Sequence, residues 1–252
     1  MQNNTTERTQ IGLPNLDKLL EGGLPKRTIN LISGACGTGK TILAMHFIYH
    51  GAKYLNEPGV YVTLEEEPED MINDMRSFGW DIDELVAQKK IAILKPEVYK
   101  FDSMKQAIGD SIERIDAKRI VIDSYSLLLG SFSDFSDLYK VRNGLVSLDR
   151  EIKKRKCTAM IISDTKDGSD ILSASGLEEH IVDGVIVLYL MKKPNYPFEA
   201  FRALSIRKMR STHHPLDLYP FEITEHGISI EGRSLEDMLE NMEDPSQSGR
   251  KR

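Results

Sequence analysis

The sequence predicts an α/β fold in which a central, mostly parallel sheet is flanked by helices and extended by antiparallel strands toward the C-terminus. Two observations carry this prediction. Between residues 28 and 163, apolar runs typical of β-strands alternate with helical stretches. From residue 184 onward, strand-like runs follow one another through short connections, without a long helix between them. Alternation of strands and helices favours parallel pairing, whereas directly connected strands favour antiparallel pairing.

Each element has its own local signal. Strands are expected where apolar residues run without helical spacing, at residues 28–33, 59–64, 91–94, 119–123, 158–163, 184–191, 200–209, 220–223 and 228–231. Helices are expected at residues 16–20, 42–54, 68–78, 81–87, 104–115, 138–152 and 235–242. Gly22-Gly23 ends the first helix, and Pro68 lies at the start of the third.

Two of these helices show a clear apolar face. In the helix near residue 108, this face consists of Met104, Ile108, Ile112 and Ile115. Their spacing is explained by packing on a core. Apolar residues between positions 138 and 152 recur every three or four residues, a pattern also found in coiled coils. Two heptads are too few for a coiled coil, so a helix packed on the sheet is expected.

Length and composition favour one large domain. The chain has 252 residues, 40% of them hydrophobic, which is enough for one substantial core. We assign residues 11–231 to this domain, residues 1–10 to a flexible N-terminus, and residues 232–252 to a short acidic helix followed by a disordered tail.

Charge and cysteine content limit the function classes. The formal net charge is −6, so a sequence-independent electrostatic grip on nucleic acid is not favoured. Cys36 and Cys157 are the only cysteines, which makes a disulfide framework improbable and fits a reducing cytoplasm. The sequence has neither a signal peptide pattern nor an apolar stretch long enough for a membrane span, so no membrane role is expected.

The strongest motif is a G-x-x-x-x-G-K-T loop between the first predicted sheet strand and the next helix. It consists of Gly34, Ala35, Cys36, Gly37, Thr38, Gly39, Lys40 and Thr41. Glycines let such a loop bring backbone N–H groups against the phosphates of a nucleotide, while Lys40 supplies charge and Thr41 can ligate Mg²⁺. The alternative is a glycine-rich turn without a ligand, but the flanking strand and helix are those the motif requires.

Acids at strand ends complete the predicted site. Asp123 ends an apolar strand, where it can hold Mg²⁺ beside the Thr41 hydroxyl; helix capping is the alternative. Glu65 and Glu66 follow another strand, at the sheet edge where nucleotides bind, and either could activate water. Glu67, like the two acids after Pro68, fits an acidic first helical turn instead.

A pair of cations ends a later strand. Lys208 and Arg210 are two residues apart and therefore point the same way in a β-strand. One interpretation is an edge strand protected by charge. The other is a pair of fingers that reach the γ-phosphate held by a neighbouring subunit.

Together these motifs resemble the KaiC-like ATPases of the RecA superfamily. The resemblance spans about residues 8–231 and rests on the G-A-C-G-T-G-K-T loop, V-T-L-E-E at 62–66, R-S-F-G-W at 76–80, I-D-S at 122–124, and K-M-R at 208–210 with His214. The chain resembles the single-domain members. The resemblance implies a RecA-like P-loop NTPase core that binds ATP and Mg²⁺ and assembles as a homo-oligomer, with a ring-shaped hexamer expected.

The resemblance also implies roles for individual residues. Nucleotide contacts are implied for Thr38, Gly39, Lys40, Thr41 and Ile42, catalysis for Glu65 and Glu66, positions near the base for Ser77 and Glu225, and contacts with a neighbour's nucleotide for Lys208, Arg210, Thr212 and His214. The adjacent Ser and Thr that accept phosphate in the clock protein are absent from residues 178–183, so autokinase activity is in doubt. A complete guanine-specificity motif is also missing after Thr165, which favours ATP over GTP.

We therefore expect a cytoplasmic, Mg²⁺-dependent, slow ATPase whose oligomeric ring acts as a nucleotide-controlled switch on a regulatory protein partner. Two alternatives remain. One is an ATP-binding scaffold without significant hydrolysis, which Glu65 and Glu66 argue against. The other is a RecA-type DNA-handling ATPase, disfavoured by net acidity and by the absence of a basic, glycine-rich insertion after Asp123.

Overall fold

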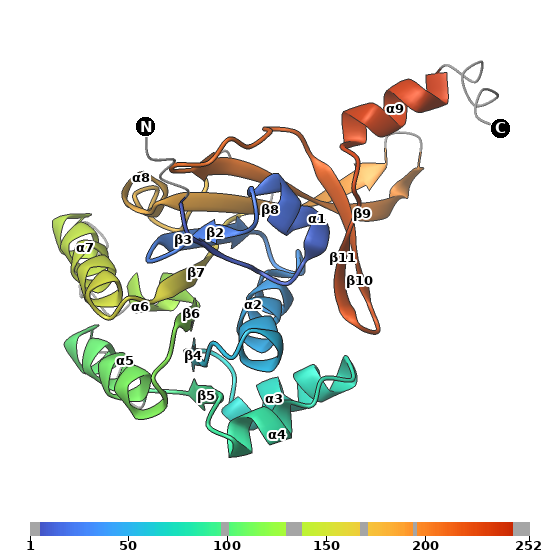
Figure 1. Ribbon diagram of the computed structural model, residues 1–252. Helices are drawn as coiled ribbons and strands as arrows, with labels where there is room; N and C mark the ends of the chain where they lie inside the picture. Colours follow the sequence, from blue (N-terminus) through green and yellow to red (C-terminus); the bar gives the residue numbers. More distant parts are fainter. Residues whose placement is uncertain (1–5, 97–100, 130–137, 167–170, 194–195, 244–252) are drawn as a thin grey trace, which may run out of the picture.

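The computed structural model describes residues 6–96, 101–129, 138–166, 171–193 and 196–243. Within these residues, a nine-stranded sheet has the order β11-β10-β9-β8-β3-β7-β6-β4-β5 (Figure 1). Its strands are β3 (Ile29–Gly34), β4 (Gly59–Thr63), β5 (Ile91–Leu94), β6 (Arg119–Asp123), β7 (Thr158–Asp164), β8 (Gly184–Lys193), β9 (Tyr196–Met209), β10 (Tyr219–Thr224) and β11 (Gly227–Ile230). A separate two-stranded ribbon pairs β1 (Arg8–Thr9) with β2 (Leu24–Pro25).

The direction of the strands confirms the predicted fold class. The strands β8, β3, β7, β6, β4 and β5 are parallel. The strands β9, β10 and β11 extend the sheet with antiparallel pairing, starting from β8. The carboxyl ends of all six parallel strands therefore meet at one edge of the sheet, as the predicted nucleotide site requires.

Helices cover both faces of the sheet (Figure 1). They are α1 (Pro14–Leu19), α2 (Lys40–Tyr54), α3 (Pro68–Ser77), α4 (Ile82–Ala87), α5 (Phe101–Ile115), α6 (Tyr125–Leu129), α7 (Leu138–Lys154), α8 (Glu178–Ile181) and α9 (Leu235–Glu243). Buried residues of α2, α3 and α4 join one core cluster, and those of α5 and α7 join another on the opposite face. In α7, Leu145, Leu148 and Ile152 are buried in that second cluster, so this helix packs on the sheet as predicted.

Four short elements were not predicted, namely β1, β2, α6 and α8. Residues 8 and 9 lie in β1, inside the segment expected to be flexible. Thr9 is buried, and Arg8 donates a hydrogen bond to Glu21, so burial and side-chain bonds hold this strand in place. Two-residue strands carry no detectable periodicity, which is why the pattern missed them.

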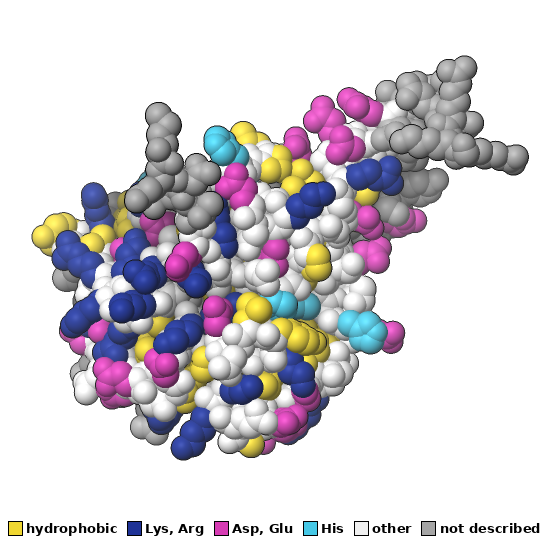
Figure 2. Space-filling model, in the orientation of Figure 1, with side chains coloured by type: hydrophobic (Ala, Val, Ile, Leu, Met, Phe, Trp, Pro, Cys, Tyr) yellow, Lys and Arg dark blue, Asp and Glu magenta, His cyan; other side chains and the backbone are white. Residues whose placement is uncertain are grey.

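The C-terminal helix α9 stands away from the body of the molecule, and acidic side chains gather around it (Figures 1 and 2). Its first turn carries Glu236 and Asp237. The acidic helix is thus present where it was predicted, while the expected disordered tail from residue 244 lies outside the described residues. Among the described helices, none has the length and apolar character needed to cross a bilayer.

Candidate active site

The phosphate loop follows β3 directly and ends at the start of α2. Gly34 pairs in register with Asp164 of β7 and Leu188 of β8, and a Cβ there would lie 2.5 Å from the Leu188 carbonyl oxygen. Gly37 and Gly39 have φ values of 77° and 100°, in the left-handed region that favours glycine. Gly39 is the N-cap of α2, so the free N–H groups of this helix face the carboxyl edge of the sheet.

The lysine of the loop is already engaged. The Lys40 side chain is only 8% exposed, and its Nζ donates to the Ala35 carbonyl oxygen at 2.9 Å. The same Nζ forms an ion pair with Asp164 Oδ1 at 3.0 Å. Thr38 Oγ1 donates to the Ala35 carbonyl oxygen at 2.8 Å. The loop is therefore held in shape by its own side chains. The Asp164 carboxylate pairs with the Lys40 ammonium group, which is the group expected to bind phosphate.

Thr41 and Asp123, the two expected metal ligands, are hydrogen-bonded to each other. Thr41 Oγ1 donates to Asp123 Oδ2 at 2.9 Å, and the hydroxyl of Tyr61 donates to the same oxygen at 2.7 Å. Burial raises the pKa of Asp123, and the nearby carboxylates of Glu65 and Asp164 raise it further. A hydroxyl and a carboxylate are ligands that Mg²⁺ accepts together with phosphate oxygens, and a divalent cation would relieve the repulsion among these acids. The residues therefore fit a Mg²⁺ site.

Glu65 and Glu66 lie between β4 and α3, on the same edge as the phosphate loop. The Ser124 hydroxyl donates to Glu65 Oε1 at 3.0 Å, which ties this carboxylate to the end of β6. Thr63 Oγ1 accepts from the Glu66 N–H at 3.0 Å. Partial desolvation raises the pKa of Glu66, with further contributions from Asp74 and other nearby acids. A carboxylate with a raised pKa is a better proton acceptor for water attack.

Glu67 has a different role. It is the N-cap residue of α3, Pro68 follows in the first turn, and Glu67 pairs with Lys95 at 2.6 Å. This agrees with the helix-turn interpretation and separates Glu67 from the two catalytic candidates.

The two positions expected near the base lie on segments that pack against each other. Ser77 ends α3, and Glu225 is in the turn between β10 and β11. At Gly227, the first residue of β11, a Cβ would lie 2.9 Å from the Trp80 ring and even closer to His46. A cavity of about 320 Å³ opens beside them, lined by Gly12, His46, Tyr49, His50, Tyr54, Phe78, Gly79, Trp80 and His226. Its aromatic faces are suited to a flat ring. Ile42 packs against the core on the same face of the sheet.

Lys208 and Arg210 lie at the opposite edge of the sheet from the phosphate loop. Met209, between them, pairs with Gly184, which in turn pairs with Asn30 at the start of β3. Lys208 Nζ donates to the carbonyl oxygens of residues 179 and 182 at 3.0 and 2.6 Å, and Arg210 pairs with Asp183 at 2.9 Å.

Two further residues share that edge. Thr212 Oγ1 donates to the Arg210 carbonyl oxygen at 3.2 Å and accepts from Arg8, and the His214 ring contacts the Pro215 carbonyl oxygen at 3.1 Å. The structure therefore does not bring these four residues to the nucleotide loop of their own chain. Their contact with a neighbour's nucleotide stays a prediction.

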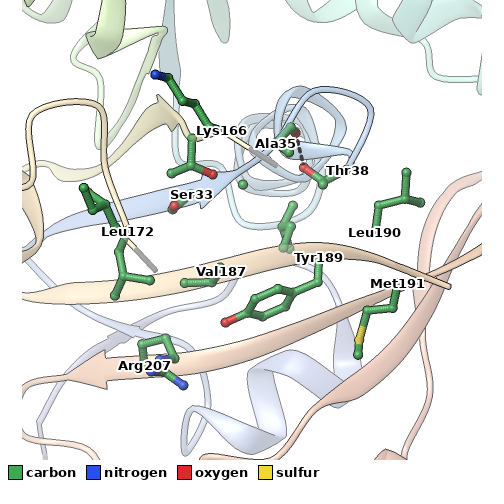
Figure 3. A pocket seen from close by; sticks show the side chains of 14 residues that line it. Ser33, Ala35, Thr38, Lys166, Leu172, Val187, Tyr189, Leu190, Met191 and Arg207 are labelled. Carbon is green, nitrogen blue, oxygen red and sulfur yellow. Dashed lines mark hydrogen bonds between the residues drawn. The ribbon is translucent and has the colours of Figure 1, made fainter. Parts of the chain in front are cut away.

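A second cavity, of about 390 Å³, adjoins the phosphate loop (Figure 3). Its lining combines Ser33, Ala35 and Thr38 of β3 and the loop with Val187, Tyr189 and Arg207 of the neighbouring strands β8 and β9. The sequence did not predict this cavity, since its walls come from strands distant in the chain.

Three polar residues of the site were missed from the sequence: Tyr61, Ser124 and Asp164. Asp164 carried a usable signal, because it ends an apolar strand just as Asp123 does. Tyr61 carried none, because a tyrosine within a buried strand is equally compatible with core packing.

Comparisons with known proteins identify the family of the chain. The family model of the KaiC ATPases matches residues 9–234. The UPF0273 protein of Methanocaldococcus jannaschii is 36% identical over 241 residues, covering 89% of this chain and 96% of that protein. The circadian clock oscillator protein KaiC of Parasynechococcus marenigrum is 31% identical over 234 residues, covering 89% of this chain but 44% of that protein. This chain thus spans less than half of KaiC.

A solved structure confirms the fold. The crystal structure of the KaiC-like protein of Pyrococcus horikoshii matches with a TM-score of 0.81 and 39% identity, covering 90% of this chain and 99% of that one. The fold and the phosphate loop define a RecA-like P-loop protein. The chain belongs to the KaiC ATPase family and is therefore of the nucleotide-binding ATPase class.

Proposed function

We propose that this protein is a slow, Mg²⁺-dependent ATPase that works as a nucleotide-controlled oligomeric switch. The observation that carries the proposal is the convergence of a phosphate loop, a Thr41–Asp123 pair and two glutamates at one edge of the sheet. This is the minimum set for phosphoryl transfer to water, because it combines phosphate binding, a metal position and a base.

Each group has a role in the proposed reaction. The N–H groups of the loop and Lys40 bind the β- and γ-phosphates and neutralise their charge. When bound, Mg²⁺ supplies positive charge to the phosphate oxygens, and Thr41 and Asp123 would hold it. Glu65 or Glu66 accepts a proton from the attacking water; Glu66 has the raised pKa, and Glu65 has the fixed orientation from Ser124.

The site is completed, in this proposal, by a neighbouring subunit. Lys208 and Arg210 lie at the far edge of the sheet, so they can serve a second copy of the chain only if copies associate head to tail. Such an interface forms a ring when the rotation between neighbouring copies closes, and we propose that it closes as a hexamer. A ring whose interfaces contain nucleotide would change with nucleotide state, and a regulatory protein partner would detect that change. We place the protein in the cytoplasm, in keeping with its free cysteines.

The test separates hydrolysis from binding. Glu65→Gln with Glu66→Gln should leave ATP binding nearly intact and lower turnover at least tenfold, about 1.4 kcal/mol of barrier. Lys40→Ala should instead weaken binding. Glu69→Gln, in the first turn of α3, is the matched control and should behave as wild type. Equal turnover in wild type and the double variant would favour the ATP-binding scaffold.

The DNA-handling alternative has an independent test. On the face shown in Figure 2, basic side chains are interspersed with acidic ones. Filter binding to single-stranded DNA at two salt concentrations should show no retention, whereas salt-sensitive retention would support that alternative.

A further inference from the structure

The carboxylate of Asp164 is paired with the lysine of the phosphate loop. It pairs with Lys40 Nζ at 3.0 Å, and that lysine is the cation of the phosphate loop. The Asp164 side chain is 46% exposed, whereas that of Lys40 is 8% exposed. Of the two partners, the carboxylate is therefore the one that can turn away into solvent when phosphate arrives.

Strand order identifies which phosphate it competes with. In the sheet, β7 lies between β3, which leads into the phosphate loop, and β6, which ends in Asp123. Asp164 at the end of β7 thus lies between the loop and the Mg²⁺ ligands. Thr41 and Asp123 would hold Mg²⁺ against the terminal phosphates, so a γ-phosphate is expected on this side of the loop.

The backbone of Asp164 is held firmly. Its N–H donates to Ser126 Oγ at 2.8 Å, and the next N–H, of Thr165, donates to the Gly34 carbonyl oxygen at 3.2 Å. Only the side chain is left to move. If the Asp164 carboxylate stays near Lys40, its negative charge repels the γ-phosphate of a bound triphosphate. It has much less effect on a diphosphate, which ends at the β-phosphate and lies farther away.

We propose that Asp164 determines the ratio of ATP to ADP affinity by acting as an internal substitute for the γ-phosphate on Lys40. The Lys40 ammonium has three N–H donors, so the β-phosphate of ADP can share it with Asp164, whereas the γ-phosphate of ATP must displace the carboxylate. The pair therefore favours the diphosphate state and slows exchange of product for substrate. This inference rests on the proposed nucleotide binding at the loop.

Calorimetric titration of the full chain with Mg²⁺ and either β,γ-imido-ATP or ADP tests the proposal. Asp164→Asn, which keeps shape and removes charge, should tighten imido-ATP binding about fivefold and ADP binding less than twofold. Asp110→Asn, an exposed carboxylate on α5, makes the same change in net charge and should alter neither affinity. Asp164→Ser should reproduce the shift in the ratio, and thermal unfolding of each variant confirms that it folds.

The other outcomes each overturn the proposal. An unchanged ratio of affinities, or equal tightening for both nucleotides, would show that Asp164 does not distinguish the γ-phosphate. Weaker imido-ATP binding in Asp164→Asn would show that the carboxylate supports the ligand. If wild type binds neither nucleotide, the proposed function fails together with this inference; if wild type binds both and the ratio does not change, the inference alone fails.

Discussion

The position of Lys208 and Arg210 leads to a mixing experiment. Arg210→Ala removes the proposed finger, and Glu65→Gln with Glu66→Gln removes the proposed bases. If each site takes its acids from one subunit and its finger from the next, both homo-oligomers lack one half of every site. Both should be nearly inactive, and mixing them should restore activity.

The structure gives the magnitudes. On β8, Gly184 is the register partner of Met209 and Leu188 is the register partner of Gly34. The level of Met209 and the level of the phosphate loop are therefore four residues apart along β8. At about 3.3 Å per residue this is ~13 Å along the strand, before the lateral distance across β8 is added. Arg210, bonded to Asp183 at that far edge, cannot reach its own loop. In random mixed rings, about one interface in four combines intact acids with an intact finger, so about a quarter of the wild-type activity should return.

The assay is steady-state release of phosphate from ATP at constant total protein, as the mixing ratio is varied after dissociation and reassembly. Activity should peak near equal amounts of the two variants. Arg207→Ala, which changes an exposed cation on the same strand, should itself remain active. In equal mixture with the carboxylate variant it should give about half of the wild-type activity, because every subunit then has an intact finger and only the acids are missing from half of the sites. A monomeric wild type with full turnover, or mixtures no more active than their parents, would refute the two-subunit site. Lys208 and Arg210 would then be charges that protect a strand end.

Two further predictions concern the stability of the fold. Burial holds the pKa of Asp123 above 3.8, so the protein loses stability as pH rises through the pKa of this carboxyl in the folded state. Asp123→Asn should therefore raise the Tm at pH 7 by about 2–4 °C. The same variant should abolish Mg²⁺-dependent ATP binding. A lower Tm would contradict this, with Asp110→Asn as the control. Burial lowers the pKa of His46 from 6.5 to about 4. The stability that depends on the neutral, buried ring should therefore be lost as pH falls through this window, and the free energy of unfolding should decrease by ~2–3 kcal/mol. Chemical denaturation at several pH values should show a flatter profile for His46→Gln, and an unchanged profile would refute the assignment; His226→Gln is the exposed control.

Local signals account for most of what the sequence predicted correctly. The loop between β3 and α2, the strand ending at Asp123 and the acidic turn after Glu66 are each defined within about ten residues. Helix and strand periods are also local, so the six parallel strands and the three antiparallel ones could be placed before their order was known. Short elements such as α6 and α8 span too few residues to show a period.

What the sequence could not give is the order of strands in the sheet. Asp164 ends an apolar strand just as Asp123 does, but only the order β3-β7-β6 places it beside Lys40. The same is true of the aromatic cavity near Trp80, whose walls come from α2, from the segment after α3 and from the β10–β11 turn. These are long-range pairings, and no local pattern records them.

The distribution of charge along the sheet predicts that nucleotide binding and hydrolysis can be separated in this protein. The edge with the phosphate loop carries Lys40 but also Asp123, Asp164 and the two glutamates, so it binds a nucleotide only after the carboxylates are neutralised or displaced. The proposed finger cations are held at the opposite edge by Asp183 and by backbone carbonyls. A single chain therefore has an excess of negative charge where the transition state needs positive charge. If the fingers come from a neighbour, assembly supplies that charge, and turnover should depend on the concentration of the protein as well as of ATP.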